Sequence, residues 1–241
     1  MAKGEYKGPE IVFENVTKEY PNRVKALDNV SFTIEPGEFV FLMGHSGSGK
    51  SSLIKLMMLE ERPTSGKITI GDDDLSEIKG GKIPYYRRKI GVVFQDFRII
   101  KSKSVSENVS FAMEITGEKR KEIARKVDLV LNIVGLQRKA GEMPDCLSGG
   151  EQQRIAIARA IVNVPGLIIA DEPTGNLDPA NSVEIMNLLE KINEKGATVV
   201  VATHERELAE RMGKRIIMLN HGVKSDSNDD ASAVFGGDSD E

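Results

Sequence analysis

The most informative residues form the glycine-rich loop GHSGSGKSS at positions 44–52. An apolar run, EFVFLM, precedes it, a helical pattern, LIKLMMLEE, follows it, and the loop matches G-x-x-x-x-G-K-[ST]. Glycine lets the backbone curl until several N–H groups point at one anion, and a helix N-terminus adds its dipole. Lys50 would then reach the outer phosphates of a nucleotide, and the Ser51 hydroxyl would bind Mg²⁺. A flexible linker explains the composition but not this position between strand and helix, so we predict a phosphate-binding loop.

An acidic pair ends a second apolar run, LIIADE, at residues 167–172. Asp171 would hold Mg²⁺ through water, as the acidic residue at this strand end does in P-loop enzymes. Glu172 comes one residue later, where it could orient an attacking water or accept its proton. The alternative is an ordinary Asp-Glu pair before Pro173 at a helix start.

Two further polar residues, Gln95 and His204, follow apolar runs of the same kind. Gln95 could instead be a plain turn residue, and His204 could cap the helical segment ERELAERM. Ligands of open α/β sheets bind beyond the carboxyl ends of the strands. We therefore expect the glycine loop, Gln95, the acidic pair and His204 to converge on one site.

The segment LSGGEQQR at 147–154 is the most specific stretch. Ser148 and Glu151 form an S-x-x-E capping box, which is its simplest explanation. Two glycines in a first helical turn cost roughly 1 kcal/mol each relative to alanine, so they suggest that something approaches this backbone closely. If that partner is a nucleotide, it belongs either to this chain or to another copy, and the residues alone leave both open.

The elements that must position these residues alternate between strand and helix. Four apolar runs, EFVFLM, IGVVF, LIIA and ATVVVAT, predict strands buried on both faces, as in a parallel sheet. Before them, EIVFENVTKEY and NVSFTIEPGEFVFLMG alternate apolar and polar residues, which predicts antiparallel pairing. Helices are expected over 50–60, 118–134, 151–162, 179–194 and 204–213, and a mostly helical small subdomain over 105–140. The sequence therefore predicts an α/β domain with right-handed crossovers.

Composition narrows the class of protein. The 241 residues carry a net charge of −4, but residues 222–241 hold six acidic residues and one lysine, a net of −5, which leaves +1 for the remainder. A nearly neutral body argues against broad nucleic-acid binding. No apolar run approaches the ~18 residues of a membrane span, and no signal peptide is recognisable, so we expect a cytoplasmic protein that does not insert into membranes directly. The single cysteine, Cys146, fits a reducing compartment. The acidic tail is expected to be disordered.

Taken together, the loop, LSGGEQQR, LIIADE and the strand-end histidine resemble, in order and spacing, the ATP-binding subunits of ABC transporters. The resemblance covers about residues 10–222 and implies a P-loop NTPase fold. That fold has a mainly parallel core sheet, an N-terminal antiparallel β subdomain and a helical subdomain at about 96–160, leaving 223–241 as a tail. It also implies a homodimer on ATP binding, in which each ATP lies between one P-loop and the other chain's signature helix.

The resemblance implies these roles, residue by residue. Glu172 and His204 would be catalytic, and Ser51, Gln95 and Asp171 would contact Mg²⁺. ATP would be bound by Tyr20, Gly44, His45, Ser46, Gly47, Ser48, Gly49, Lys50, Ser51, Ser52 and Gln95, with Tyr20 stacked on adenine unless it is merely a strand-end tyrosine. The signature contacts in trans would be Ser148, Gly149, Gly150 and Gln152, and the D-loop residue would be Asp178, which with Pro179 also suits a helix start.

Within the family, GHSGSGKSSLIKL, IPYYRRKIGVVFQDFRII and ADEPTGNLDPANSVEIMNLLEKIN are similar to the cell-division branch, the FtsE proteins of the Gram-positive type. This similarity implies a membrane-spanning FtsX-like partner, control of cell-wall hydrolases, and a peripheral location on the cytoplasmic face of the plasma membrane. The alternative within the family is a lipoprotein-releasing or macrolide-type exporter. Outside it, an ABC protein acting on nucleic acid would carry long insertions or two cassettes, which this chain lacks. A nucleotide-dependent interaction module with incidental hydrolysis is the third possibility.

Overall fold

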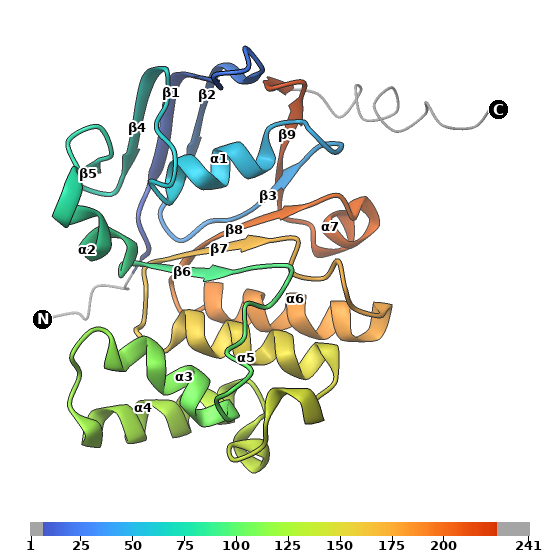
Figure 1. The fold of residues 1–241 in the computed structure, drawn as a ribbon. Helices are drawn as coiled ribbons and strands as arrows, with labels where there is room; N and C mark the ends of the chain where they lie inside the picture. The colour runs from blue at the N-terminus through green and yellow to red at the C-terminus, as the bar shows by residue number, and fades with distance from the viewer. Residues whose placement is uncertain (1–6, 226–241) are drawn as a thin grey trace, which may run out of the picture.

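The computed structural model describes residues 7–225, which form two sheets flanked by helices (Figure 1). An antiparallel sheet has the order β2-β1-β4-β5, and a six-stranded sheet has the order β10-β9-β3-β8-β7-β6. The first sheet contains β1 (Ile11–Glu19), β2 (Lys25–Ile34), β4 (Ser65–Ile70) and β5 (Asp73–Asp74). The second contains β3 (Phe39–Met43), β6 (Ile90–Val93), β7 (Leu167–Asp171), β8 (Thr198–Thr203), β9 (Arg215–Asn220) and β10 (Val223–Ser225).

Seven α-helices connect the described strands. They are α1 (Lys50–Met57), α2 (Ile83–Arg87), α3 (Val105–Glu114), α4 (Arg120–Ile133), α5 (Gly149–Ile161), α6 (Pro179–Asn193) and α7 (Arg206–Met212). Short 3₁₀ turns lie at Gly80–Lys82, Gln137–Lys139 and Pro144–Cys146. No helix among residues 7–225 is long and apolar enough to cross a membrane.

The six-stranded sheet separates two hydrophobic cores. Alternate residues of β3 face opposite ways: Phe39, Phe41 and Met43 pack into the core that contains α3 to α6, whereas Val40 and Leu42 pack with α1 and the antiparallel sheet. Figure 1 shows this layering, with α1 on one side of the sheet and α5 and α6 on the other. All residues of β3 and β8 are buried, which confirms that these runs are strands covered on both faces.

The strands β3, β8, β7 and β6 pair in parallel, as the four apolar runs predict, β9 adds a fifth parallel strand beside β3, and β1 pairs antiparallel with β2. The prediction is incomplete at the edges of the sheets. The sequence does not predict the strands β4, β5, β9 and β10 or the helix α2. The first three residues of β4 are exposed and α2 is five residues long, so neither shows a clear period.

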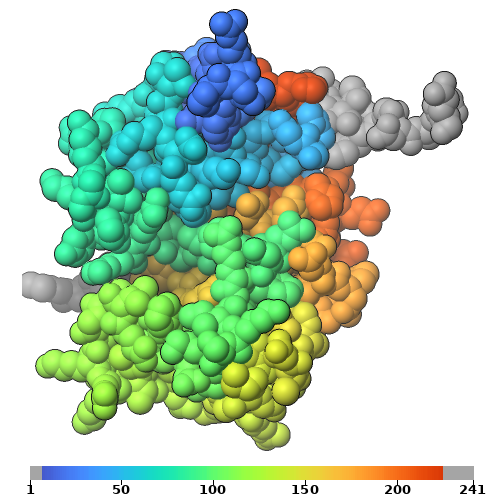
Figure 2. All heavy atoms as spheres, in the orientation of Figure 1, coloured from blue at the N-terminus to red at the C-terminus, as the bar shows by residue number. Residues whose placement is uncertain are grey.

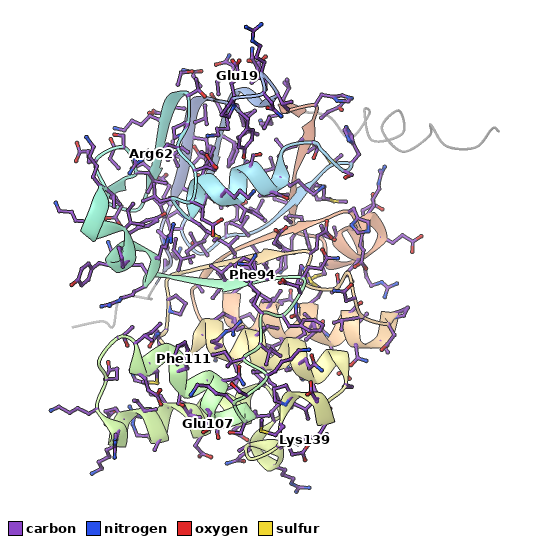
Figure 3. All side chains as sticks on the ribbon, in the orientation of Figure 1. Glu19, Arg62, Phe94, Glu107, Phe111 and Lys139 are labelled. Atoms are coloured by element: carbon purple, nitrogen blue, oxygen red, sulfur yellow. The ribbon has the colours of Figure 1, made fainter. Side chains whose placement is uncertain are left out.

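The helices α3, α4 and α5 pack together beneath the parallel sheet, at the lower end of Figure 1. The capping box of α3 fixes its start, since Glu107 N–H donates to Ser104 Oγ and the Glu107 carboxylate accepts from Ser104 N–H (Figure 3). Strand β10 begins one residue past position 222, where the predicted ATPase domain ends. Residues 226–241 of the predicted tail lie outside the described residues.

Candidate nucleotide-binding site

One cavity of about 750 Å³ lies at the carboxyl ends of the parallel strands. The polar strand-end residues predicted to converge, Gln95, Asp171, Glu172 and His204, all line it. Its other lining residues are Tyr20, Val24, Lys25, Ala26, His45, Ser46, Gly47, Ser48, Gly49, Lys50, Ser51 and Ser52. The cavity therefore brings together every residue predicted to contact ATP within one chain except Gly44, the first residue of the loop, which is buried.

The glycine loop ends in the first turn of α1. Gly49 occupies the N-cap position with φ +107°, and no side chain caps the helix. A Cβ atom at Gly49 would lie 2.5 Å from the carbonyl oxygen of Ala26, so the position requires glycine for space as well as for conformation. The N–H groups of this turn remain available to an anion, and the first turn contains no acidic side chain to compete with it.

Two buried groups in the loop are poised for a ligand. The Ser48 hydroxyl is buried and has no hydrogen-bond partner among the described residues. The Lys50 ammonium is also buried and donates to the carbonyl oxygens of Gly44 and His45. Buried polar groups are normally paired, so this hydroxyl is a donor that an anion bound in the loop could use. The loop thus has the donors that a phosphate requires.

The hairpin turn between β9 and β10 braces this loop. Gly222 N–H donates to the Ser48 carbonyl oxygen (3.1 Å), and His45 Nε2 lies 3.3 Å from Asn220 Oδ1. The rings of His45 and His221 are 4.7 Å apart. These contacts hold the loop from the side opposite α1.

The acidic end of the cavity is formed by β7 and β8. Glu172 follows the last residue of β7 with φ +47°, a left-handed conformation that is rare for a non-glycine residue and accompanies functional constraint. Its N–H donates to the Ala202 carbonyl oxygen, and its Oε2 lies 2.9 Å from His204 Nδ1. His204 does not cap α7, because that helix begins after Glu205 and has no side-chain cap. The histidine instead orients the glutamate.

Burial and charge perturb the two groups that face each other across the site. Burial, with the Glu172 charge beside it, raises the pKa of Asp171. Burial lowers the pKa of Lys50, although Glu172 and Asp171 oppose this shift. Such perturbed pKa values concentrate at functional sites, where burial and neighbouring charges are combined.

The raised pKa of Asp171 predicts how the free energy of unfolding depends on pH. Between the ordinary value of 3.8 and the raised value, the folded chain binds more protons than the unfolded chain, so the free energy of unfolding falls as pH rises through this window. We expect Asp171→Asn to raise the melting temperature at pH 7 by a few degrees in the absence of nucleotide. The gain should shrink as pH is lowered toward 3.8. Thermal unfolding of both proteins across pH 4–8 measures this, and a lower melting temperature for the variant at pH 7 would contradict it.

Tyr20 lies one residue beyond β1 and contributes its ring to the cavity wall. Its hydroxyl lies 3.2 Å from Ser52 Oγ on α1. This contact links the end of β1 to the first turn of α1. The ring is the only aromatic surface among the described lining residues apart from the histidines.

Gln95 lies where β6 leaves the sheet. The Gln95 carbonyl accepts from Asn176 Nδ2 (2.9 Å), and a Cβ atom at Gly175 would lie 2.9 Å from Gln95 Nε2. The next segment contains two left-handed residues, Phe97 and Arg98, whose carbonyl oxygens accept from Arg159 at 2.9 and 2.6 Å. Gln95 connects the cavity to a braced loop that crosses the front of the molecule in green in Figure 2.

The LSGGEQQR segment forms the start of α5 and does not reach this cavity in the described chain. Ser148 is the N-cap and makes the predicted capping box with Glu151. Lys139, labelled in Figure 3, holds that glutamate at 2.7 Å, and this pair lowers the pKa of Glu151. Gln152 donates to the carbonyl oxygens of Pro144 and Leu147, which fixes the preceding turn. Ser148 and Gly149 remain accessible at the surface.

The two glycines of α5 differ in their surroundings, and this gives a second prediction. A Cβ atom at Gly150 would collide with the side-chain amide of Asn181 on α6, whereas one at Gly149 would meet Leu177 Cδ2 at an ordinary 3.4 Å. We expect Gly150→Ala to lower the free energy of unfolding by about 1–3 kcal/mol, and Gly149→Ala to change it by less than about 1 kcal/mol. Adding Asn181→Ala should recover most of the Gly150→Ala loss. Chemical denaturation measures all three, and equal losses for the two glycines would contradict this explanation.

Asp178 begins α6, as the sequence predicts. Its side chain accepts from the N–H groups of Ala180 and Asn181, both at 3.1 Å, and Pro179 occupies the first turn. Hydrogen bonds from Asn181, through its side chain and its backbone, lower the pKa of Asp178. The carboxylate is exposed and lies outside the cavity.

Sequence reasoning missed Gln153, which is buried at the centre of α5. Its Nε2 donates to the Pro173 carbonyl oxygen (2.6 Å), directly after Glu172, so it ties the signature helix to the acidic strand end. Its Oε1 has no partner among the described residues. The available signal was spacing, because Gln153 shares a helical face with the buried Gly150 and Ile157. Lys25, Val24 and Ala26 also line the cavity without any motif to mark them.

The fold and the cavity together define an ATP-binding cassette. The family model described as "ABC transporter" matches residues 27–175. Among solved structures, the ATP-binding cassette MJ0796, described as a dimer in a post-hydrolysis state bound to ADP and Pi, has a TM-score of 0.80 and 39% identity, covering 89% of this chain and 96% of that one. The structure of cbiO1 from Clostridium perfringens, described as part of the ABC transporter complex cbiONQ, has a TM-score of 0.84 and 29% identity, with 94% and 91% covered.

Curated relatives narrow the family. The cell division ATP-binding protein FtsE of Bacillus subtilis is 54% identical over 213 residues, which is 88% of this chain and 93% of the relative. FtsE of Mycobacterium tuberculosis is 48% identical, with 88% and 93% covered, and FtsE of Escherichia coli is 46% identical, with 88% and 96% covered. The chain belongs to the ABC transporter ATPases and, within them, to the FtsE family.

Proposed function

We propose that this chain is the ATP-hydrolysing subunit of an FtsE–FtsX complex, which dimerises on ATP and signals through its membrane partner to cell-wall hydrolases during division. The observation that carries the ATPase assignment is the convergence of the loop, Asp171, Glu172 and His204 on one cavity. Identity to FtsE proteins over 88% of the chain supports the cell-division role. The identities argue against the lipoprotein-releasing and macrolide-type alternatives.

In the proposed reaction, Glu172 is the group that orients water and accepts its proton. A water between Glu172 and the γ-phosphate would attack phosphorus, the bond to the ADP oxygen would break, and phosphate and ADP would result. His204 holds the Glu172 carboxylate at 2.9 Å and so sets the direction from which the proton is taken. Lys50 and the N–H groups of α1 stabilise charge on the phosphate oxygens.

The residues present fit a magnesium ion. Asp171, the Ser51 hydroxyl and the Gln95 amide would hold it, and the ion would neutralise charge on the β- and γ-phosphates. No group of three or more His, Cys, Asp or Glu within residues 7–225 forms a metal site by itself. This agrees with Mg²⁺, which binds through one or two carboxylates together with substrate phosphates and waters.

The geometry of α5 supports binding in trans. Ser148, Gly149 and Gly150 begin a capped helix outside the chain's own cavity. A Cβ atom would fit at Gly149, so packing within this chain does not explain why the residue is glycine. We propose that this end, with Gln152 and Asp178 close by, contacts the γ-phosphate held by a second copy. ATP would then join two chains because its phosphates contact both, and hydrolysis would remove that bridge.

The proposed surface for the FtsX-like partner is the segment that follows Gln95, at residues 96–115. It combines the braced carbonyls at Phe97 and Arg98 with Phe111 and Ile115, two partly exposed apolar side chains on and after α3 (Figure 3). A partner here would place the chain at the cytoplasmic face of the plasma membrane. In this proposal residues 10–222 form the ATPase domain, with the helical subdomain at about 96–160.

The deciding experiment is capture of tagged Glu172→Gln protein with ATP from its native membranes. We expect an FtsX-like protein to co-purify, followed by wall hydrolases. Recovery of a lipoprotein-release or drug-export permease in its place would leave the ATPase chemistry intact and overturn the cell-division role. The exposed Glu184→Gln variant, outside the cavity, is the matched control for ATP-dependent capture.

A further inference from the structure

The Tyr20 ring has a cation over one of its faces. Lys18 Nζ lies 4.8 Å from the centre of the ring. Tyr20 lines the cavity, whereas Lys18 is buried and is not among the lining residues. An ammonium thus covers one face of a ring that lines the cavity, from a residue that does not line the cavity itself.

Fixed partners hold this ammonium in place. Lys18 Nζ donates to Glu61 Oε2 (2.7 Å) and to the Arg62 carbonyl oxygen (3.0 Å), both just past the end of α1. Arg62 is labelled in Figure 3, beside β4 of the antiparallel sheet. The other end of the arrangement is the contact between the Tyr20 hydroxyl and Ser52, at the start of α1. The Tyr20 ring is thus held by contacts near both ends of α1: its hydroxyl contacts Ser52 at the start, and Lys18, over its face, is bonded to residues past the end.

We propose that Lys18 is a positioning and affinity-setting residue for the nucleobase, acting through the Tyr20 ring. The inference rests on the proposed function, in which adenine stacks on Tyr20. The ring quadrupole attracts the ammonium, so Lys18, itself held by Glu61, fixes the ring in one orientation in which its other face can stack with a planar base. A ring already fixed in its bound orientation also loses less conformational freedom when the base arrives.

The test compares nucleotides with and without a base. Lys18→Met keeps the buried stem and removes the charge. We expect its Kd for ATP, measured by titration calorimetry, to rise about two- to fivefold, and its KM to rise by the same factor with kcat unchanged. The Kd for ribose 5-triphosphate, which carries the phosphates and no base, should stay as in the unmodified chain. A merely structural role would weaken both ligands equally, and that result would overturn the proposal.

A double mutant isolates the route of the effect. In a Tyr20→Ala background, Lys18→Met should cause no further loss of ATP affinity, because the ring through which Lys18 acts is absent. Lys67→Met is the matched control, since Lys67 forms a surface pair with Asp74 on the same sheet and lies outside the cavity. Unchanged ATP affinity for Lys18→Met alone would overturn the inference and leave the ATPase assignment standing. Failure of the unmodified chain to bind ATP would overturn both.

Discussion

Glu172→Gln is expected to reduce the rate of ATP hydrolysis by about 10²–10⁴-fold while ATP still binds. The amide keeps the shape of the carboxylate but cannot accept a proton, and the left-handed backbone that places the side chain should be unaffected. The ATP-bound protein should therefore accumulate as a dimer, because the phosphates that bridge two chains are no longer removed. Phosphate release gives the rate, and analytical ultracentrifugation with ATP and Mg²⁺ gives the oligomeric state.

Two further variants test whether the loss of hydrolysis is specific to the Glu172 carboxylate. Glu184→Gln, at an exposed position on α6, should hydrolyse ATP at the unmodified rate. His204→Ala should retain part of the activity, because it removes the hydrogen bond to Glu172 and not the carboxylate itself. Turnover of ATP by Glu172→Gln at the unmodified rate would show that another group activates the water.

Lys50→Met has the second large expected effect, a loss of ATP affinity of about 10- to 150-fold, the range that corresponds to one hydrogen bond to a charged group. The buried ammonium faces both Asp171 and Glu172, so its removal leaves like charges facing the phosphates. A fluorescent ATP analogue measures the affinity. Since burial lowers the pKa of Lys50, affinity in the unmodified chain should also begin to fall at a lower pH than an ordinary lysine would give.

Lys191→Met, on an exposed part of α6, is the matched control and should bind ATP normally. Equal affinity for Lys50→Met and the unmodified chain would refute the phosphate role of this lysine. Comparing the two active-site variants in cells also separates two views of the pathway. If Lys50→Met blocks division and Glu172→Gln does not, ATP-driven dimerisation is the signal and hydrolysis is incidental.

The cavity could be predicted from the sequence because its residues follow strands whose apolar runs are unmistakable. The strand-end positions of Gln95, Asp171 and His204 determine that they meet, since parallel strands bring their carboxyl ends to one edge of the sheet. Lys25 and Ala26 could not be found in this way. They reach the cavity from the start of β2, in another sheet, and nothing in their own sequence marks that approach.

The glycines of α5 show a different limit. The two glycines indicate that another group packs closely against the backbone at the start of α5, but the sequence does not identify that group. At Gly150 the neighbour is Asn181 of the same chain, whereas Gly149 has no comparable internal requirement. Similarly, the strand β9 escaped prediction because three of its six residues are only half-buried and its first is exposed, which blurs the pattern of a strand covered on both faces.

The alternation of side chains on the central sheet also offers a way to monitor ligand binding and protein docking separately. On β8, Val199 and Val201 face the helical core, and Val200, between them, faces the core that contains α1. Methyl signals from neighbouring valines on a single strand therefore belong to different halves of the molecule. In a nuclear magnetic resonance titration, Val200 is placed to respond to nucleotide arriving at α1, and Val199 and Val201 to a protein docking on the helices. Three adjacent residues can thus tell which event comes first.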